Sequence, residues 1–166
     1  MAKITLKGDT VNTSGELPKV GEKAPDFTLV NSNLEEVKLS DFQGKNVVLN
    51  IFPSLDTGVC AASVRKFNEK ATSLDNTVVL GISSDLPFAA SRFCSAEGID
   101  NVITLSVFRD EDFAKDYGVL LVDGPMRGLT ARAVVIVNPE GKVIYNQLVP
   151  EISQEPDYNS AINSIV

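Results

Sequence analysis

The pattern of hydrophobic and polar positions divides the chain into short segments that have either the period of a strand or the period of a helix. Before residue 45 the alternation predicts short strands at residues 4–6, 10–12, 26–30 and 36–39. The first two flank Lys7-Gly8-Asp9 and therefore predict a small N-terminal β-hairpin. A brief helical piece is expected from residue 39 to residue 42, just before Gly44.

The central part of the chain predicts a buried strand followed by an amphipathic helix. Residues 47–52 form a continuous apolar and β-branched run, which is typical of a strand covered by helices on both faces. From residue 59 to residue 74 the apolar positions recur every three or four residues, which is the period of one helix face. Cys60 lies on that face and in its first turn.

The same alternation of strand and helix continues. Residues 77–83 and 102–107 predict two further buried strands. Between them, Asp85 is expected to be the N-cap of a second helix, with Pro87 in its first turn. The order up to this point is βαβαβ, which predicts a parallel arrangement of these strands.

The C-terminal third predicts a short helix at residues 112–117, strands at 131–137 and 143–149, and a closing helix at 157–166. The two strands flank the turn sequence Asn138-Pro-Glu-Gly-Lys142 and predict a second hairpin. We therefore predict an α/β protein with a thioredoxin-like fold, in which helices flank a central mixed sheet. No repeat or linker divides the chain, so residues 1–166 are expected to form a single domain.

Composition narrows the possible partners. The formal net charge is -7 and the Lys and Arg residues are scattered, so nucleic acid is not expected as a partner. The apolar runs are far shorter than the roughly 20 residues that span a bilayer, and the N-terminus lacks the apolar core of a secretory signal. We therefore expect a cytoplasmic protein without a membrane segment.

The reactive residue types are few. The chain has no histidine and only 2 cysteines, which excludes a Ser-His-Asp triad, a Cys-His pair and a four-thiolate zinc site. The sequence contains neither a C-x-x-C pair nor a phosphate-binding glycine motif. Zinc, nucleotide and haem sites are therefore disfavoured, and any chemistry must proceed without imidazole.

Cys60 is the strongest candidate for a reactive group. A thiolate is the nucleophilic form of cysteine, and the unpaired N–H groups and dipole of a helix start favour an anion there. Pro53 ends the preceding strand, and Thr57 supplies a hydroxyl within one turn of the sulfur. Taken alone, Cys60 could equally be a small buried hydrophobe and Thr57 only an N-cap.

The segment Pro53-Ser-Leu-Asp-Thr-Gly-Val-Cys60 resembles the P-x-x-x-[TS]-x-x-C loop of the peroxiredoxins, and its Asp-Thr-Gly-Val-Cys form resembles their thiol peroxidase subfamily. Two further segments resemble the same subfamily in the same order, namely 84–94 and 132–137. Glu155-Pro-Asp-Tyr158 also matches near the C-terminus, so the resemblance covers nearly the whole chain.

The resemblance implies roles for five residues. Cys60 would be the peroxidatic cysteine, Thr57 its hydroxyl partner, Arg132 the cation of the site and Pro53 the residue that shields it, while Cys94 would be the resolving cysteine. It also implies a hydroperoxide substrate, thioredoxin as the reductant, a homodimer, and neither a metal nor an organic cofactor. Without the resemblance, Arg132 could be an edge residue or an ion-pair partner and Cys94 a core residue.

Two other functions remain open at this point. A thiol-disulfide oxidoreductase would share the predicted fold, although the missing C-x-x-C pair is against it. A redox sensor would oxidise once at Cys60 and stop, whereas a peroxidase would turn over with thioredoxin. The sequence does not rank hydrogen peroxide against alkyl or lipid hydroperoxides.

Overall fold

A computed structural model describes residues 1–165. The helices are α1 (Gly58–Ala71), α2 (Pro87–Glu97), α3 (Phe113–Asp116) and α4 (Tyr158–Asn163), with a short 3-10 helix, η1, at Leu39–Phe42. The strands are β1 (Lys3–Leu6), β2 (Asp9–Asn12), β3 (Thr28–Asn31), β4 (Glu36–Lys38), β5 (Asn46–Ile51), β6 (Thr77–Ser83), β7 (Ile103–Ser106), β8 (Ala133–Val137) and β9 (Val143–Leu148).

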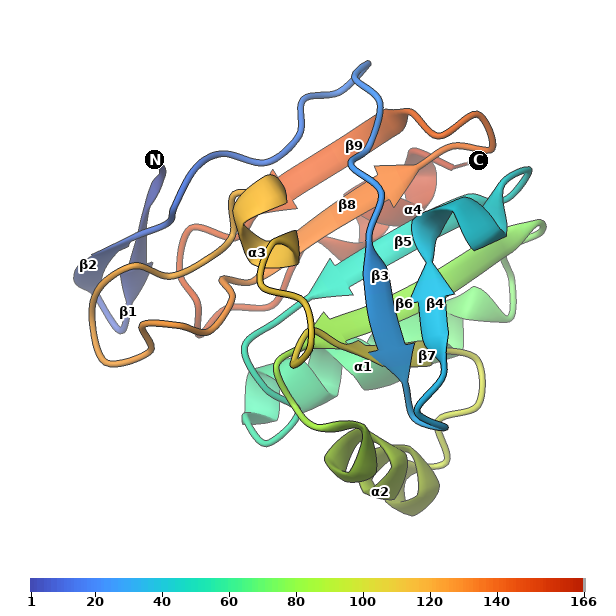
Figure 1. The fold of residues 1–166 in the computed structure, drawn as a ribbon, viewed down its shortest axis with the longest axis horizontal. Coiled ribbons are helices and arrows are strands. Elements are labelled where there is room, and N and C mark those ends of the chain that lie inside the picture. Colours follow the sequence, from blue (N-terminus) through green and yellow to red (C-terminus); the bar gives the residue numbers. More distant parts are fainter. Residues whose placement is uncertain (166) are drawn as a thin grey trace.

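A mixed seven-stranded sheet in the order β4-β3-β7-β6-β5-β8-β9 forms the centre of the molecule (Figure 1). Strands β5, β6 and β7 run parallel, as the βαβαβ pattern predicts, and β8 and β3 pair antiparallel on either side of them. The predicted thioredoxin-like α/β fold, with a central mixed sheet, flanking helices and an N-terminal hairpin, is therefore confirmed.

Strand β5 shows how the sequence builds two hydrophobic layers. Its side chains point alternately to opposite faces because successive residues of a strand do so. Val47, Leu49 and Ile51 belong to the core cluster on the side of the N-terminal hairpin and α3, whereas Val48 packs with side chains of α1, α2 and α4. All four are at most 2% exposed, which confirms a strand buried on both faces.

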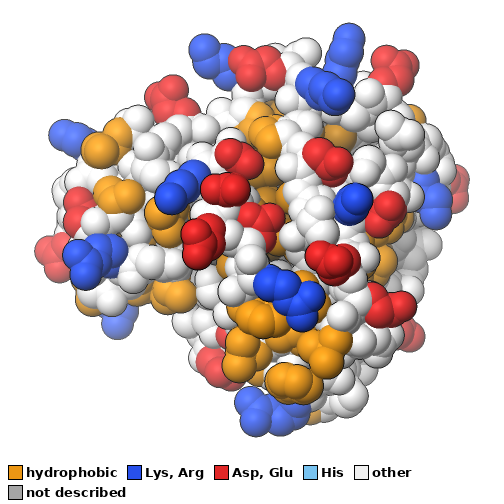
Figure 2. Space-filling view, in the orientation of Figure 1, with side chains coloured by type: hydrophobic (Ala, Val, Ile, Leu, Met, Phe, Trp, Pro, Cys, Tyr) orange, Lys and Arg blue, Asp and Glu red, His pale blue; other side chains and the backbone are white. Residues whose placement is uncertain are grey.

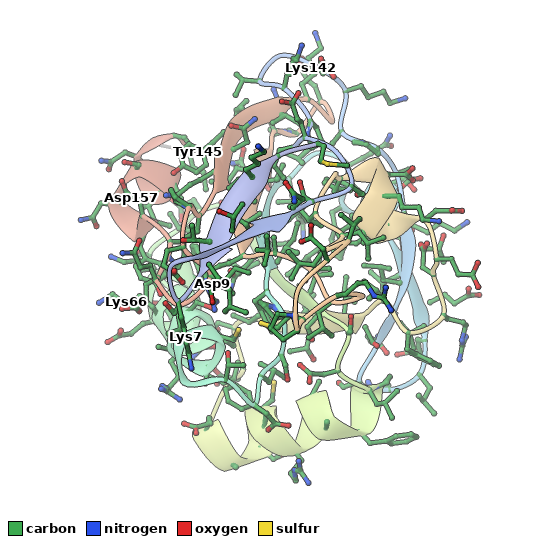
Figure 3. The ribbon with its side chains drawn as sticks, turned by 90° about the vertical axis from the view of Figure 1, so that its left-hand side faces the viewer. Lys7, Asp9, Lys66, Lys142, Tyr145 and Asp157 are labelled. Atoms are coloured by element: carbon green, nitrogen blue, oxygen red, sulfur yellow. The ribbon has the colours of Figure 1, made fainter. Side chains whose placement is uncertain are left out.

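The N-terminal hairpin lies apart from the central sheet and is fastened to the C-terminal segment. Lys7 and Gly8 form its two-residue turn, both with positive φ (51° and 89°), the backbone that suits the twist of a tight hairpin. Thr5 pairs in parallel with Glu151, and the Glu151 carboxylate accepts hydrogen bonds from the Thr5 hydroxyl and the Gly8 N–H, both at 2.9 Å. Figure 3 views the molecule from this side, with Lys7 and Asp9 in front and α2 along the lower edge.

The surface carries interspersed acidic and basic side chains, and apolar side chains gather over the α2 end of the face shown in Figure 2. Leu86 and Phe88, at the start of α2, are 52% and 68% exposed. Among the helices of residues 1–165, none has both the length and the apolar character needed to cross a membrane.

Several predicted boundaries shift by a few residues. Helix α1 ends at Ala71 rather than residue 74, because the hydroxyls of Thr72 and Ser73 donate to backbone carbonyls one turn back. The closing helix is shorter than residues 157–166: Asp157 is its N-cap, and residue 166 lies outside the described residues.

The predicted N-cap of the second helix is wrong. Leu86, not Asp85, is the N-cap residue of α2, and no side chain caps that helix. The Asp85 carboxylate turns instead toward the loop that precedes α1, where it accepts hydrogen bonds from Ser54 and Leu55. The stretch Asp-Leu-Pro is typical of a capped helix start, but a competing set of donors from a distant loop uses the carboxylate here.

Candidate active site

The loop between β5 and α1 places Cys60 in the first turn of α1. Pro53 is buried where the chain leaves β5, and Thr57 is the N-cap of the helix. The Thr57 hydroxyl accepts a hydrogen bond from the Cys60 N–H at 3.3 Å and donates one to the Ser54 carbonyl at 3.2 Å. The predicted positions of Cys60, Thr57 and Pro53 relative to the helix start are therefore correct.

Cys60 lies next to a buried guanidinium. Its side chain is 0% exposed, and Nη2 of Arg132 donates a hydrogen bond to Sγ at 3.2 Å. Arg132 therefore places a positive charge beside the sulfur, which also lies at the positive end of the α1 helix dipole. Cys60 and Arg132, which are far apart in the sequence, thus lie side by side as a sulfur and a positive charge.

The orientation of Arg132 is fixed by the backbone of another segment. Its Nε donates to the Ile152 carbonyl at 2.9 Å, and its side chain is only 1% exposed. Within residues 1–165, Nη1 has no hydrogen-bond partner and Arg132 forms no ion pair. An edge residue or an ion-pair partner would be placed differently, so these two alternatives for Arg132 are wrong. Nη1 is therefore a buried donor that no protein group within residues 1–165 uses.

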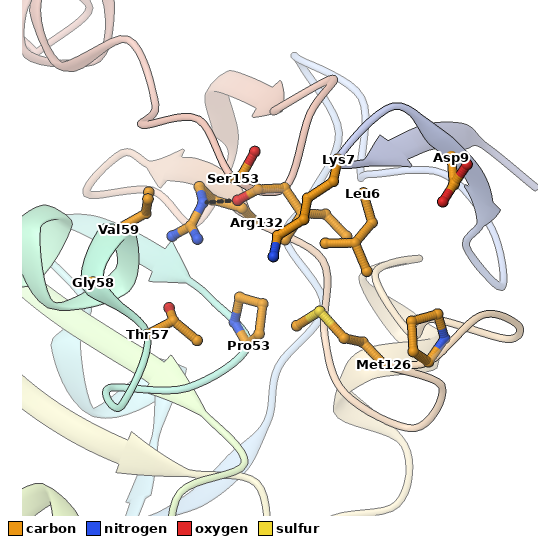
Figure 4. A pocket seen from close by; sticks show the side chains of 12 residues that line it. Leu6, Lys7, Asp9, Pro53, Thr57, Gly58, Val59, Met126, Arg132 and Ser153 are labelled. Carbon is orange, nitrogen blue, oxygen red and sulfur yellow. Dashed lines mark hydrogen bonds between the residues drawn. The ribbon is translucent and has the colours of Figure 1, made fainter.

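A pocket of about 480 Å³ opens beside Arg132 and the start of α1 (Figure 4). Most of its wall is apolar, formed by Leu6, Pro53, Val59, Pro125, Met126 and Ile152. In Figure 4 the Lys7 side chain reaches from the hairpin toward Arg132, with Pro53 and Met126 below it. The sequence does not predict that the hairpin and residues 125–126 and 152–153 line this site, because no local motif marks them.

Cys94 has different surroundings. It lies on α2, is half-buried, and packs against the same core cluster that contains Cys60. Burial raises the pKa of the Cys94 thiol, and a hydrogen bond with Thr104 acts in the opposite direction without cancelling the effect. Both cysteines are free, so the structure shows the dithiol form.

The site is built from protein groups. In the part of the chain that the structure describes, no group of three or more Cys, Asp or Glu side chains is placed to hold a metal ion. The chemistry available at Cys60 is attack by a sulfur nucleophile on an electrophile held by Arg132 and by the N-terminal turn of α1.

Comparison with known proteins identifies the family. Residues 19–162 match the Redoxin family model. The chain is 58% identical to a thiol peroxidase of Corynebacterium glutamicum and 54% identical to one of Mycobacterium bovis, with 99% of each chain covered. A peroxiredoxin-like protein from Aquifex aeolicus superposes with a TM-score of 0.94 at 42% identity, over 99% of this chain and 96% of that one. The chain therefore belongs to the redoxin family and, within it, to the thiol peroxidases of the peroxiredoxin group.

Proposed function

We propose that this chain, acting as a single domain over residues 1–166, is a thioredoxin-dependent peroxidase that reduces hydrogen peroxide and organic hydroperoxides. One observation carries the proposal: the buried Cys60 sulfur accepts a hydrogen bond from Nη2 of Arg132 at 3.2 Å, Nη1 of the same guanidinium has no protein partner within residues 1–165, and Arg132 lines a pocket. Cys60, Cys94, Thr57, Arg132 and Pro53 are the proposed site residues.

In the first step the Cys60 thiolate attacks the terminal oxygen of the hydroperoxide. A sulfur–oxygen bond forms, the O–O bond breaks, and the alkoxide or hydroxide that leaves takes up a proton. Cys60 is oxidised to a sulfenic acid and the peroxide is reduced to an alcohol or water. Arg132 holds the peroxide and stabilises the developing negative charge through its free donors, with the Thr57 hydroxyl and Pro53 on the opposite wall.

In the second step the Cys94 thiolate attacks the sulfenic sulfur. A Cys60–Cys94 disulfide forms and hydroxide leaves, which becomes water on protonation. The dithiol of thioredoxin then reduces the disulfide by thiol–disulfide exchange and returns the enzyme to the state seen in the structure.

The pocket favours substrates with an apolar body. Six of its lining residues are apolar, and the pocket volume of about 480 Å³ is much larger than a hydrogen peroxide molecule requires. We therefore propose that organic hydroperoxides react with a lower KM than hydrogen peroxide, because burial of their alkyl chain contributes binding energy.

The partners follow from the chemistry and from the family. Thioredoxin is the proposed reductant, and the cytoplasm is the proposed compartment because thiols are kept reduced there. A homodimer, which the family resemblance implies, is proposed as the working form. Sedimentation or light scattering of the reduced protein tests this form, and a monomeric mass would contradict it.

A coupled assay tests the function. Purified protein, thioredoxin, thioredoxin reductase and NADPH are mixed with hydrogen peroxide, cumene hydroperoxide or a fatty-acid hydroperoxide, and NADPH loss is followed. We expect steady turnover that disappears without thioredoxin. Consumption of only about one peroxide per chain would instead support a redox sensor, and no reaction with any peroxide would reject the proposal.

A further inference from the structure

We propose that Asp85 is a positioning residue that fastens the Cys60 loop to the start of α2, and that its release frees both segments for disulfide formation. The inference rests on the proposed peroxidase function, and it concerns how peroxide attack at Cys60 is kept separate in time from disulfide formation with Cys94. Asp85 does not cap α2 as the sequence predicts, so its carboxylate can accept hydrogen bonds from other donors.

The Asp85 carboxylate is the centre of a hydrogen-bond cluster. Its Oδ1 accepts from the Ser54 hydroxyl at 2.7 Å, and its Oδ2 accepts from the Leu55 N–H and the Ser83 hydroxyl, each at 2.7 Å. Bonds to an ionised acceptor are shorter and stronger than neutral ones. The loop before α1 is therefore held to the end of β6 by one half-buried carboxylate.

The cluster continues to the reactive sulfur. Ser54, held by Asp85, offers its carbonyl to both the N–H and the hydroxyl of Thr57, each at 3.2 Å. Thr57 in turn accepts the Cys60 N–H. A displacement of Ser54 therefore changes the N-cap of α1 and the position of Cys60 relative to Arg132.

On its other side, Asp85 precedes a weakly anchored helix. Helix α2 buries only Pro87 and Ala90, whereas α1 buries five side chains, and the N-cap of α2 has no side-chain hydrogen bond. Leu86 and Phe88 face solvent at its start. With so little burial, α2 is expected to open at a lower cost in free energy than α1.

The two proposed steps differ in whether the hydrogen bonds of Asp85 should hold or break. Peroxide attack needs Cys60 fixed beside Arg132, and a small misplacement of reacting groups costs much of the rate. The disulfide requires the two sulfurs to bond, whereas both cysteines are free in the structure and the Cys60 sulfur is buried against Arg132, so the second step requires Cys60 to leave that position. Weakening the Asp85 cluster should therefore slow the first step and speed the second.

Rapid-quench kinetics tests whether the rates of the two steps change in opposite directions. The reduced protein is mixed with peroxide, trapped with an alkylating reagent, and analysed by mass spectrometry for sulfenic acid and disulfide. In Asp85→Asn, which keeps the size but removes the charge, we expect sulfenic acid formation to slow by about tenfold and conversion of sulfenic acid to disulfide to accelerate. Ser54→Ala, which removes one donor, should show the same split with a smaller amplitude.

Asp110→Asn is the matched control. Asp110 is also half-buried and accepts two backbone N–H groups, from Asp112 and Phe113, but it lies at the start of α3 away from the cluster. We expect both of its rates to stay within about twofold of the parent protein. Unchanged rates in Asp85→Asn, or a parallel fall in both steps, would overturn the proposal. A parent protein that does not react with peroxide would instead reject the proposed function.

Discussion

Cys60 and Cys94 lie on two helices that cover the same face of the sheet, yet their environments differ in almost every respect. Cys60 is fully buried, sits at a helix start and accepts a hydrogen bond from Arg132. Cys94 is near the end of α2 and half-exposed, and burial raises the pKa of its thiol. The fold thus gives the two sulfurs different electrostatic surroundings: a guanidinium and a helix start at Cys60, and burial near a helix end at Cys94.

The difference orders the proposed reaction in time. Cys60, which lies beside Arg132, is the sulfur proposed to meet a peroxide first, and Cys94 is proposed to react after α2 moves. Substitutions at these sites and a change of pH are each expected to remove one of these differences between Cys60 and Cys94.

Cys60→Ser should lower peroxide consumption by more than about 1,000-fold, because it removes the nucleophile while changing the side-chain volume very little. Coupled turnover and the loss of peroxide measured directly both check this. Circular dichroism and thermal unfolding serve as controls for the fold. Retention of more than a few per cent of the parent activity would place the chemistry elsewhere.

Cys94→Ser should consume about one peroxide per chain and then stop with thioredoxin as reductant, since the sulfenic acid has no partner thiol. Peroxide consumed per chain and the mass of the oxidised product check this. Steady turnover of the variant would show that resolution does not require Cys94 and would leave the contrast between the two sulfurs without a function.

Arg132→Met should slow sulfenic acid formation by about 100-fold, because the peroxide loses its donors and the thiolate loses the nearby cation. The unpaired Ile152 carbonyl should also lower the free energy of unfolding by about 1–3 kcal/mol. Stopped-flow kinetics at several pH values measures the rate of sulfenic acid formation, and urea unfolding measures the free energy of unfolding. Arg132→Lys, which keeps the charge but not the fork of donors, should fall between the two proteins.

The packing of α2 should weaken as the solution becomes alkaline. Because the pKa of Cys94 is raised in the folded protein, the fold binds that proton more tightly than the unfolded chain does. This contribution is present below the ordinary thiol pKa and is lost as the pH rises through the raised value. Hydrogen exchange in α2, corrected for its intrinsic rate, should show less protection at about pH 10 than at about pH 7. Cys94→Ser should remove this difference, and equal losses in both proteins would contradict it.

Local patterns predicted the parts of the fold that depend on local physics. Strand β6 has the predicted bounds, residues 77–83, because a buried apolar run between turn residues leaves little choice. The start of α1 was also predictable, since Thr57 and Cys60 have the spacing that an N-cap side chain needs.

Contacts between distant segments were beyond such patterns. The Ile152 carbonyl that orients Arg132 is a backbone group, and no residue type marks it. Leu6 and Met126 enter the pocket wall only because the hairpin and a long loop fold over it. Asp85 had a strong local signal that proved misleading, because hydrogen bonds from Ser54 and Leu55 outweigh helix capping.

The attachment of the hairpin to the C-terminal segment has a consequence for synthesis on the ribosome. Leu6 and Lys7 precede Cys60 in the chain, whereas Ile152, which orients Arg132, and Glu151, which holds Thr5, follow it at a long distance in the sequence and leave the ribosome much later. The strands around Cys60 can pair before that point, but the wall of the pocket and the orientation of the guanidinium cannot form. A nascent chain therefore carries Cys60 without the surroundings described here, and acquires them only after residues 151 and 152 have been synthesised.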